Sequence, residues 1–497
     1  MSVESPKPNE EYDFTAEEVL KTLRPKSNRG SIEYIGSAIS NWQSEPILYD
    51  ESGNMLPPLS DWEFELQKNL KGKPSGIKVD QQGEVFPQFL KKKDDYINRS
   101  AELGQNMFRF SLEFPRLCPR DGEFNEQLMA EYVQALALIK AQGQEPMLTI
   151  SHYTMPKFLV ETNEDGKITQ GAWDNPDVLK HFRFFVDNVT KFLADEDKVR
   201  AALASERLSK QDQDKFLSDG LVKYFLSINE PIMTMQGGYL TGMFPPYKRG
   251  DVFSMKNILN KLIEAHDISR DTIKQNLKSD IAGESDPMVG VAYNWQYIDG
   301  LFGSVAHAIQ NQLLTDRFER DGAYSDFLGL QYYFRITAPL FRTNIPGREY
   351  GDHPGFGDVC PEGIFEVLKK MNARYPQKEI FITEFGFSDA SDKRRPYWVL
   401  ETLRYIIEAR KAGIPIKGML LWSIADNLEW NQGMSQKFGV FNENELSQPL
   451  IPSKDGIRTW EVWQAATKAL TDTSPESLKE LQLCYERAKI QFESYGR

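Results

Sequence analysis

The hydrophobic residues of this chain fall into two alternating patterns. Short runs of apolar and β-branched residues recur along the sequence, separated by longer segments whose apolar residues repeat every three or four positions, as in EQLMAEYVQALALIKAQG (126–143). An uninterrupted apolar run is typical of a strand buried on both faces, and the longer spacing is typical of an amphipathic helix. Eight strands are predicted: Tyr34–Ile39, Met107–Leu112, Pro146–Ile150, Lys223–Ile228, Val289–Tyr293, Asp326–Tyr333, Glu379–Thr383 and Ile416–Trp422.

Eight strand-and-helix units predict a parallel sheet covered by helices. A closed (β/α)8 TIM barrel accounts for this number of units, and a doubly wound open sheet is the alternative. The 497 residues contain no Pro/Gly/Ser-rich linker that would divide the chain. Because barrels with insertions can exceed about 400 residues, we expect a single barrel domain.

The predicted barrel spans residues 31–470. Residues 1–30 are expected to form a polar arm with one short helix, and residues 193–222 a charged insertion of surface helices. In residues 471–497 the apolar side chains recur at steps of three and four, which predicts an amphipathic helix packed on the barrel.

Composition and charge exclude several classes of protein. With 40% hydrophobic and 26% charged residues, the chain can form one large core. The net charge of −13 argues against nucleic acid or an anionic membrane surface as a partner, because both select for basic patches. Three widely spaced cysteines and five histidines without ligand spacing predict neither disulfides nor a metal site, and we expect no cofactor.

The N-terminal residues are acidic and polar, unlike the basic and apolar start of a secretory signal. No stretch is apolar over the roughly 18 residues that a membrane helix needs. We therefore expect a soluble, cytoplasmic protein. Self-association into a homo-oligomer is compatible with this sequence.

Two predicted strands end in a glutamate. EIFITEFGFSD (379–389) places Glu384 before a turn at Gly386, and YFLSINEP (224–231) places Glu230 before Pro231. Each glutamate alone could be half of a buried ion pair. In a barrel, however, both side chains would lie at the C-terminal mouth, where barrel enzymes carry out their chemistry. Glycoside cleavage requires such a carboxyl pair, so we favour catalysis.

A third cluster follows the eighth strand in LLWSIADNLEWNQGMSQKFGVF (420–441), where Trp422, Trp430 and Phe438 accompany Glu429. Aromatic rings suit the apolar faces of sugars, and a carboxylate can accept hydrogen bonds from two hydroxyls. Aromatic residues after a strand are also common in protein cores, so this cluster alone is a weak signal.

The chain resembles the family 1 glycoside hydrolases, the β-glucosidase and β-galactosidase family. The resemblance covers roughly residues 31 to 465. The motifs that carry it, in chain order, are GSAISNWQSE (36–45), FRFSLEFPRL (108–117), SHYTMP (151–156), NEP (229–231), GYLTGMFPP (238–246), DFLGLQYY (326–333), PEGIFEVLKKM (361–371), ITEFG (382–386), LLWSIADNLEW (420–430) and KFGVF (437–441).

The resemblance implies a role for each matching residue. Glu230 matches the general acid and base, and Glu384 matches the nucleophile of a double displacement that retains configuration. Arg109 and Tyr333 match the residues that hold the nucleophile ionised, and Asn229 matches the contact to the sugar 2-hydroxyl.

The same resemblance assigns further residues to substrate binding. Gln43, His152, Glu429 and Trp430 match the residues that hold the outer hydroxyls of the sugar, while Trp422 and Phe438 match an aromatic wall. A lone histidine after an apolar strand is more often a core residue, so the role of His152 depends on the resemblance.

Several positions depart from the family pattern. Tyr153 replaces a usual tryptophan and Gln331 a usual asparagine, and we place both among the substrate-binding residues. Phe385 replaces an asparagine beside the nucleophile and is expected to influence which sugar is accepted. Glu113 and Phe114 stand where serine and tryptophan are common.

The sequence therefore predicts a retaining β-glycosidase that hydrolyses β-glucosides, β-galactosides or related small glycosides and oligosaccharides. Glu429 followed by Trp430 argues against the 6-phosphoglycosidase branch. SDASDKRRPYWVLETL (388–403) is similar to archaeal β-glycosidases and plant galactolipid galactosyltransferases. Two alternatives stay open: a transglycosylase that uses the same two glutamates, and a catalytically weak sugar-binding relative.

Overall fold

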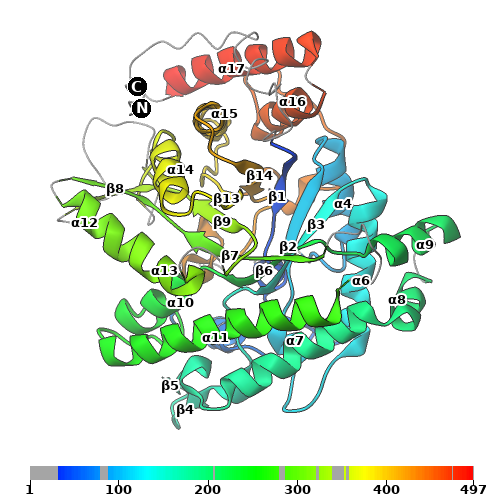
Figure 1. Cartoon of the computed structure of the whole chain (residues 1–497), viewed down its shortest axis with the longest axis vertical. Coiled ribbons are helices and arrows are strands. Elements are labelled where there is room, and N and C mark those ends of the chain that lie inside the picture. The colour runs from blue at the N-terminus through cyan, green and yellow to red at the C-terminus, as the bar shows by residue number, and fades with distance from the viewer. Residues whose placement is uncertain are drawn as a thin grey trace.

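The computed structural model describes residues 32–78, 88–204, 208–278, 286–300, 302–320, 324–338, 352–353, 357–472 and 474–495 (Figure 1). Eight parallel strands close into a barrel in the order β1-β14-β13-β9-β7-β6-β3-β2, which confirms the predicted TIM barrel. Their bounds are β1 Tyr34–Ala38, β2 Met107–Ser111, β3 Glu145–Ser151, β6 Tyr224–Asn229, β7 Met288–Asn294, β9 Leu328–Tyr332, β13 Ile380–Phe385 and β14 Ile416–Trp422.

Helices surround the barrel (Figure 1). They are α2 Asn41–Ser44, α3 Asp61–Leu70, α4 Lys93–Glu102, α5 Phe114–Leu117, α6 Glu126–Ala141, α7 Val178–Ala194, α8 Glu196–Leu203, α9 Lys210–Asp219, α10 Pro231–Met235, α11 Val252–Asn276, α12 Gly303–His307, α13 Leu314–Glu319, α14 Gly363–Arg374, α15 Arg395–Lys411, α16 Thr459–Thr471 and α17 Pro475–Tyr495.

Shorter elements connect these helices and strands. The 3₁₀ and π turns are η1 Lys157–Leu159, η2 Ala172–Asp174, η3 Gln236–Leu240, η4 Ala308–Leu313, η5 Trp430–Ser435 and η6 Glu443–Glu445. Two small sheets lie outside the barrel, formed by β4 Glu161–Thr162 with β5 Ile168–Gln170, and by β8 Tyr297–Gly300, β10 Arg335–Ala338, β11 Asp352–His353 and β12 Gly357–Asp358.

Local sequence signals explain where the helices begin and end. In α6, the side chain of Asn125 accepts a hydrogen bond from the backbone N–H of Leu128 at 3.0 Å and caps the first turn. Gly143 lies just beyond the helix with a φ of +74°, which a glycine adopts without steric cost. The predicted stop at Gly143 is therefore two residues past the last helical residue.

Two apolar layers hold the barrel together. Inside the barrel, inward side chains from the strands form one cluster that includes Tyr224, Phe327 and Phe381. The Phe381 ring lies 5.1 Å from Tyr224 and 5.0 Å from Phe327, so this end of the barrel is filled by aromatic packing. A larger cluster fills the layer between the strands and the surrounding helices. The side chains of Tyr224, Phe327 and Phe381 fill the barrel at the N-terminal ends of its strands, which leaves the C-terminal ends free to form a site.

The segments outside the repeating units are also helical where the structure describes them. Helices α8 and α9 occupy the charged segment between α7 and β6. Helix α17 packs against α15 and α16 beside the barrel (Figure 1). The predicted N-terminal arm, residues 1–30, lies outside the described residues.

Candidate functional site

A cavity of about 220 Å³ opens at the C-terminal ends of the strands. Small-molecule sites typically measure roughly 300–1,000 Å³, so this cavity suits a ligand of modest size. It is lined by Gln43, His152, Tyr153, Asn229, Glu230, Met233, Met243, Phe244, Asn294, Tyr333, Phe334, Glu384, Trp422, Glu429, Trp430, Asn431, Gln432 and Phe438. Of the residues that the sequence analysis singled out for this site, Arg109, Gln331 and Phe385 do not line the cavity.

A shift in strand register turns Glu384 into the cavity, whereas Glu230 lies directly after β6 with a φ of +41°. The pairing of β13 with β9 slips between Ile382 and Glu384, and the pairing of β6 with β7 slips between Leu226 and Asn229. A register shift of this kind turns a side chain that strict alternation would send to the other face. Glu384 therefore joins Glu230 in the barrel mouth.

Glu384 is surrounded by hydrogen-bond donors. Its Oε1 accepts from Arg109 Nη1 at 2.5 Å and from Gln331 Nε2 at 2.6 Å, while its Oε2 accepts from the hydroxyl of Tyr333. Burial raises the pKa of the Glu384 carboxyl, and Arg109 and Tyr333 oppose this rise. The donors therefore favour the carboxylate form, and Arg109 and Tyr333 both contact Glu384.

Arg109 organises the floor of the site. It is fully buried, and it donates to Thr149 Oγ1 at 2.9 Å and to Asn229 Oδ1 at 2.7 Å in addition to Glu384. Gln331 Nε2 also donates to Asn229 Oδ1 at 2.7 Å. Gln331 thus orients Glu384 and Asn229 without lining the cavity itself. The prediction that Gln331 binds substrate is therefore corrected: it supports two residues that line the cavity.

Glu230 has a different set of partners. Asn294 Nδ2 donates to Glu230 Oε1 at 2.7 Å, and the hydroxyl of Tyr153 donates to Oε2. Burial and the neighbouring Glu384 raise the pKa of Glu230 to about 8. Because Arg109 contacts Glu384 directly, the negative charge of the pair belongs on Glu384 and the proton on Glu230.

A third carboxyl group, that of Glu429, lines the same cavity. Glu429 Oε1 accepts from Trp422 Nε1 and Asn427 Nδ2, both at 2.9 Å, and Oε2 accepts from Gln43 Nε2 at 3.3 Å. Burial raises the pKa of Glu429 to about 7. Trp422 therefore anchors Glu429 through its indole N–H as well as presenting its ring to the cavity.

Two buried polar atoms beside the cavity accept or donate no hydrogen bond within the described part of the chain. They are Gln43 Oε1 and His152 Nδ1. Burial and the nearby charge of Arg109 hold the pKa of His152 well below its usual range, so the ring is neutral and can pair with a hydroxyl. Since buried polar atoms are normally paired, both atoms suit a polar ligand.

The prediction for Phe385 is wrong. Its side chain is fully buried outside the barrel wall, with ring centroids 6.1 Å from Trp398 of α15 and 5.8 Å from Trp463 of α16. The register shift that turns Glu384 inward sends Phe385 to the helix layer. Phe385 therefore packs in the core and does not line the cavity.

Some residues of the site were missed from the sequence. Asn294 ends β7 next to Glu230, and Asn427 holds Glu429. Gln296 Oε1 accepts from the backbone N–H groups of Tyr333 and Phe334 at 3.2 and 2.9 Å and fixes the loop after β9. A polar amide at or just after the end of a barrel strand was the available signal, and Asn294 shares it with Asn229.

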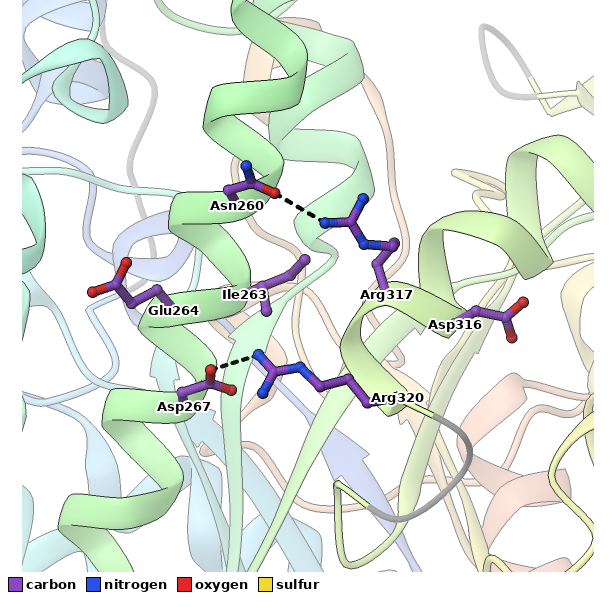
Figure 2. A pocket seen from close by; sticks show the side chains of 7 residues that line it. All are labelled: Asn260, Ile263, Glu264, Asp267, Asp316, Arg317 and Arg320. Carbon is purple, nitrogen blue, oxygen red and sulfur yellow. Dashed lines mark hydrogen bonds and ion pairs between the residues drawn. The ribbon is translucent and has the colours of Figure 1, made fainter.

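A second hollow, of about 460 Å³, lies outside the barrel between α11 and α13 (Figure 2). Its two arginines bond to side chains of α11: Arg317 donates to Asn260 at 3.0 Å and Arg320 to Asp267 at 2.6 Å. Asp267 is ion-paired to Arg320 and Asp316 to Arg374, so the barrel mouth is the better candidate for catalysis.

The described residues contain no group of three or more His, Cys, Asp or Glu side chains placed to hold a metal ion. In the same part of the chain, every helix is too short or too polar to cross a bilayer.

A closed (β/α)8 barrel whose mouth holds two buried glutamates with different partners, together with aromatic side chains, is typical of a barrel glycosidase. Sequence comparison agrees with this class. The profile of glycosyl hydrolase family 1 matches residues 36–211 and 355–454, which is more than half of the chain. The protein belongs to glycosyl hydrolase family 1.

Individual relatives are distant. β-Glucosidase A of Thermotoga maritima is 22% identical over 433 residues, which cover 77% of this chain and 88% of that protein. The rice protein named β-glucosidase-like SFR2, chloroplastic, is 27% identical over 390 residues, or 74% of this chain. The match spans only 54% of the rice protein, so this chain corresponds to about half of its length.

Solved structures share the fold at low identity. The β-glycosidase of Thermosphaera aggregans superposes with a TM-score of 0.69 at 20% identity, covering 92% of this chain and 99% of the other. The β-glycosidase of Pyrococcus horikoshii gives a TM-score of 0.66 at 22% identity, covering 93% and 99%. The family and the barrel expected from the sequence are confirmed, and the low identities agree with a divergent member.

Proposed function

We propose that this protein is a retaining β-glycosidase that cleaves small β-glucosides, β-galactosides or related glycosides. The observation that carries the proposal is the asymmetry of the two glutamates in one cavity. Glu384 is paired with Arg109 at 2.5 Å, whereas Glu230 has only neutral donors and a raised pKa. One carboxylate is thereby prepared to attack, and one carboxylic acid is prepared to give a proton.

In the first step, an oxygen of Glu384 attacks the anomeric carbon while the glycosidic bond breaks. Glu230 gives its proton to the departing oxygen, and Glu384 becomes covalently bound to the sugar. In the second step, water attacks the anomeric carbon, Glu230 takes a proton from it, and the bond to Glu384 breaks. Two inversions restore the original configuration.

The remaining residues of the cavity divide by chemistry. Asn229 presents its amide N–H₂ group, since its Oδ1 already accepts from Arg109 and Gln331, and we assign it to the sugar 2-hydroxyl. Gln43, His152 and Glu429 are assigned to the outer hydroxyls. Trp422, Trp430 and Phe438 supply aromatic surface for the sugar ring.

A transglycosylase that uses the same glutamates is the second candidate. One of the similar proteins is named galactolipid galactosyltransferase SFR2, chloroplastic, from Arabidopsis thaliana, and is 24% identical over 424 residues. In such an enzyme an acceptor hydroxyl would replace water in the second step.

Since the names of the plant SFR2 proteins place them in the chloroplast, cytoplasmic localisation of this protein stays a prediction, and so does its self-association.

The proposal is tested by following the product of aryl β-glucoside and β-galactoside cleavage by proton NMR. We expect the β-anomer to form first and mutarotation to follow, whereas an initial α-anomer would contradict the double displacement. Repeating the reaction with an added sugar or galactolipid acceptor distinguishes the two candidates: free sugar indicates hydrolysis, and a new β-glycoside indicates transfer.

A further inference from the structure

A tyrosine hydroxyl contacts the carboxyl group to which we assign proton transfer. Tyr153 follows β3, lines the cavity and donates its O–H to Oε2 of Glu230. Asn294 Nδ2 donates to Oε1 of the same group at 2.7 Å. Both oxygens of Glu230 are therefore held by donors from the protein, one of them a phenol.

The position of this hydroxyl is fixed by the packing of the tyrosine ring. The ring centroid lies 4.7 Å from that of Trp430, at an interplanar angle of 85°, and 5.3 Å from that of Phe244, at 72°. The backbone of Tyr153 has a φ of +69°, in the left-handed region that non-glycine residues rarely adopt. Such backbone strain persists only where surrounding structure enforces it, and it is common at functional sites.

We propose that Tyr153 is a positioning residue for Glu230, whose phenolic O–H, together with Asn294, holds the Glu230 carboxylate in the orientation from which it exchanges its proton. The inference rests on the proposed role of Glu230. Tyr153 keeps its own proton throughout the reaction, because burial and the adjacent carboxylate raise the pKa of its hydroxyl well above the ordinary value. Its contribution is a hydrogen bond to the ionised form, which is the form that accepts the proton of water.

The charged and titratable groups that face Glu230 come from several elements. The negative charge of Glu384 in β13 disfavours the ionised form of Glu230, while the positive charge of Arg109 in β2 favours it. Tyr333 follows β9 and lies beside Glu384. Tyr153 acts with Arg109, because a donor stabilises the carboxylate and lowers its pKa. Removing the hydroxyl therefore raises the pKa of Glu230.

The test is the pH dependence of Tyr153→Phe. Loss of one hydrogen bond to a charged group corresponds to about one pKa unit, so the alkaline limb of the kcat/KM profile is expected to move up by about one pH unit. Tyr153→Met also lacks the hydroxyl but packs differently, and should show the same shift. Tyr239→Phe is the matched control, since Tyr239 is a buried tyrosine whose hydroxyl donates to Asp174 at 3.1 Å instead.

A second measurement does not depend on activity. Infrared titration follows the protonated carboxyl band of Glu230, identified by its loss in Glu230→Gln. We expect this band to persist to higher pH in both hydroxyl-lacking variants and to titrate as in the wild type in Tyr239→Phe.

The outcomes separate this inference from the proposed function. An unchanged Glu230 titration in Tyr153→Phe and Tyr153→Met would overturn the inference, as would an equal loss of activity at every pH, which indicates packing alone. If the protein cleaved no glycoside but the infrared shift occurred, the contact would stand and the proposed function would fail.

Discussion

Glu384→Gly is expected to abolish glycoside turnover, lowering kcat by on the order of 10⁴-fold or more, as for the loss of other enzymic nucleophiles. No other carboxylate of the cavity is ion-paired to Arg109, so none replaces Glu384 in the attack. The glycine leaves a space beside the anomeric carbon. Added azide should enter that space and restore cleavage of activated substrates, giving a glycosyl azide of inverted configuration.

The matched control is Glu384→Gln, whose amide fills the same space. It should be equally inactive, and azide should not rescue it. Both variants should remain folded by circular dichroism and urea unfolding, because Arg109 keeps its hydrogen bonds to Thr149 and Asn229. Near-normal kcat in a folded Glu384→Gly protein would exclude Glu384 as the nucleophile.

Glu230→Gln is expected to lower kcat/KM about 10²- to 10⁴-fold for glycosides with poor leaving groups, the usual contribution of a general acid. Dinitrophenyl glycosides should lose far less in their first step, because their leaving group departs without a proton. In the wild type, kcat/KM should fall as pH rises through about 8, where Glu230 loses the proton it must donate. The variant should lack this alkaline limb.

Glu113→Gln provides the control for that pH effect. Glu113 is fully buried and does not line the cavity, and burial raises its pKa to about 8 as well. Its carboxylate accepts hydrogen bonds from the Trp42 backbone N–H and from Thr154. If the alkaline limb vanished in Glu113→Gln and persisted in Glu230→Gln, the acid would be misassigned.

Much of the barrel could be predicted because its strands are continuous apolar runs. All eight predicted runs coincide with barrel strands, with ends that differ by at most two residues, as in Tyr34–Ala38. The two catalytic candidates were also predictable, since a glutamate after a buried run is costly unless it is paired or functional. Both the strands and the two glutamates can be recognised from short stretches of sequence, because a strand buried on both faces must be apolar along its length.

The contacts across the barrel could not be predicted in the same way. Gln331 reaches Glu384, Tyr153 reaches Glu230, and Asn294 reaches Glu230 from a neighbouring strand, and each pair is far apart in sequence. The orientation of Phe385 depends on a register shift, which reverses the face that alternation assigns. Both the contacts across the barrel and the orientation of Phe385 depend on how neighbouring strands pair, and the sequence of one strand alone does not determine that pairing.

The central claim is that Glu384 forms a covalent bond to the sugar. Its most direct test is incubation with 2-deoxy-2-fluoro glycosyl fluorides of the gluco, galacto, manno and fuco series, followed by peptide mapping of the trapped enzyme by mass spectrometry. The account predicts one sugar bound per chain, attached to Glu384 in the peptide that contains it. The series that reacts would reveal the preferred sugar. A sugar attached to a different residue, or no adduct from any series in an enzyme that cleaves glycosides, would contradict it.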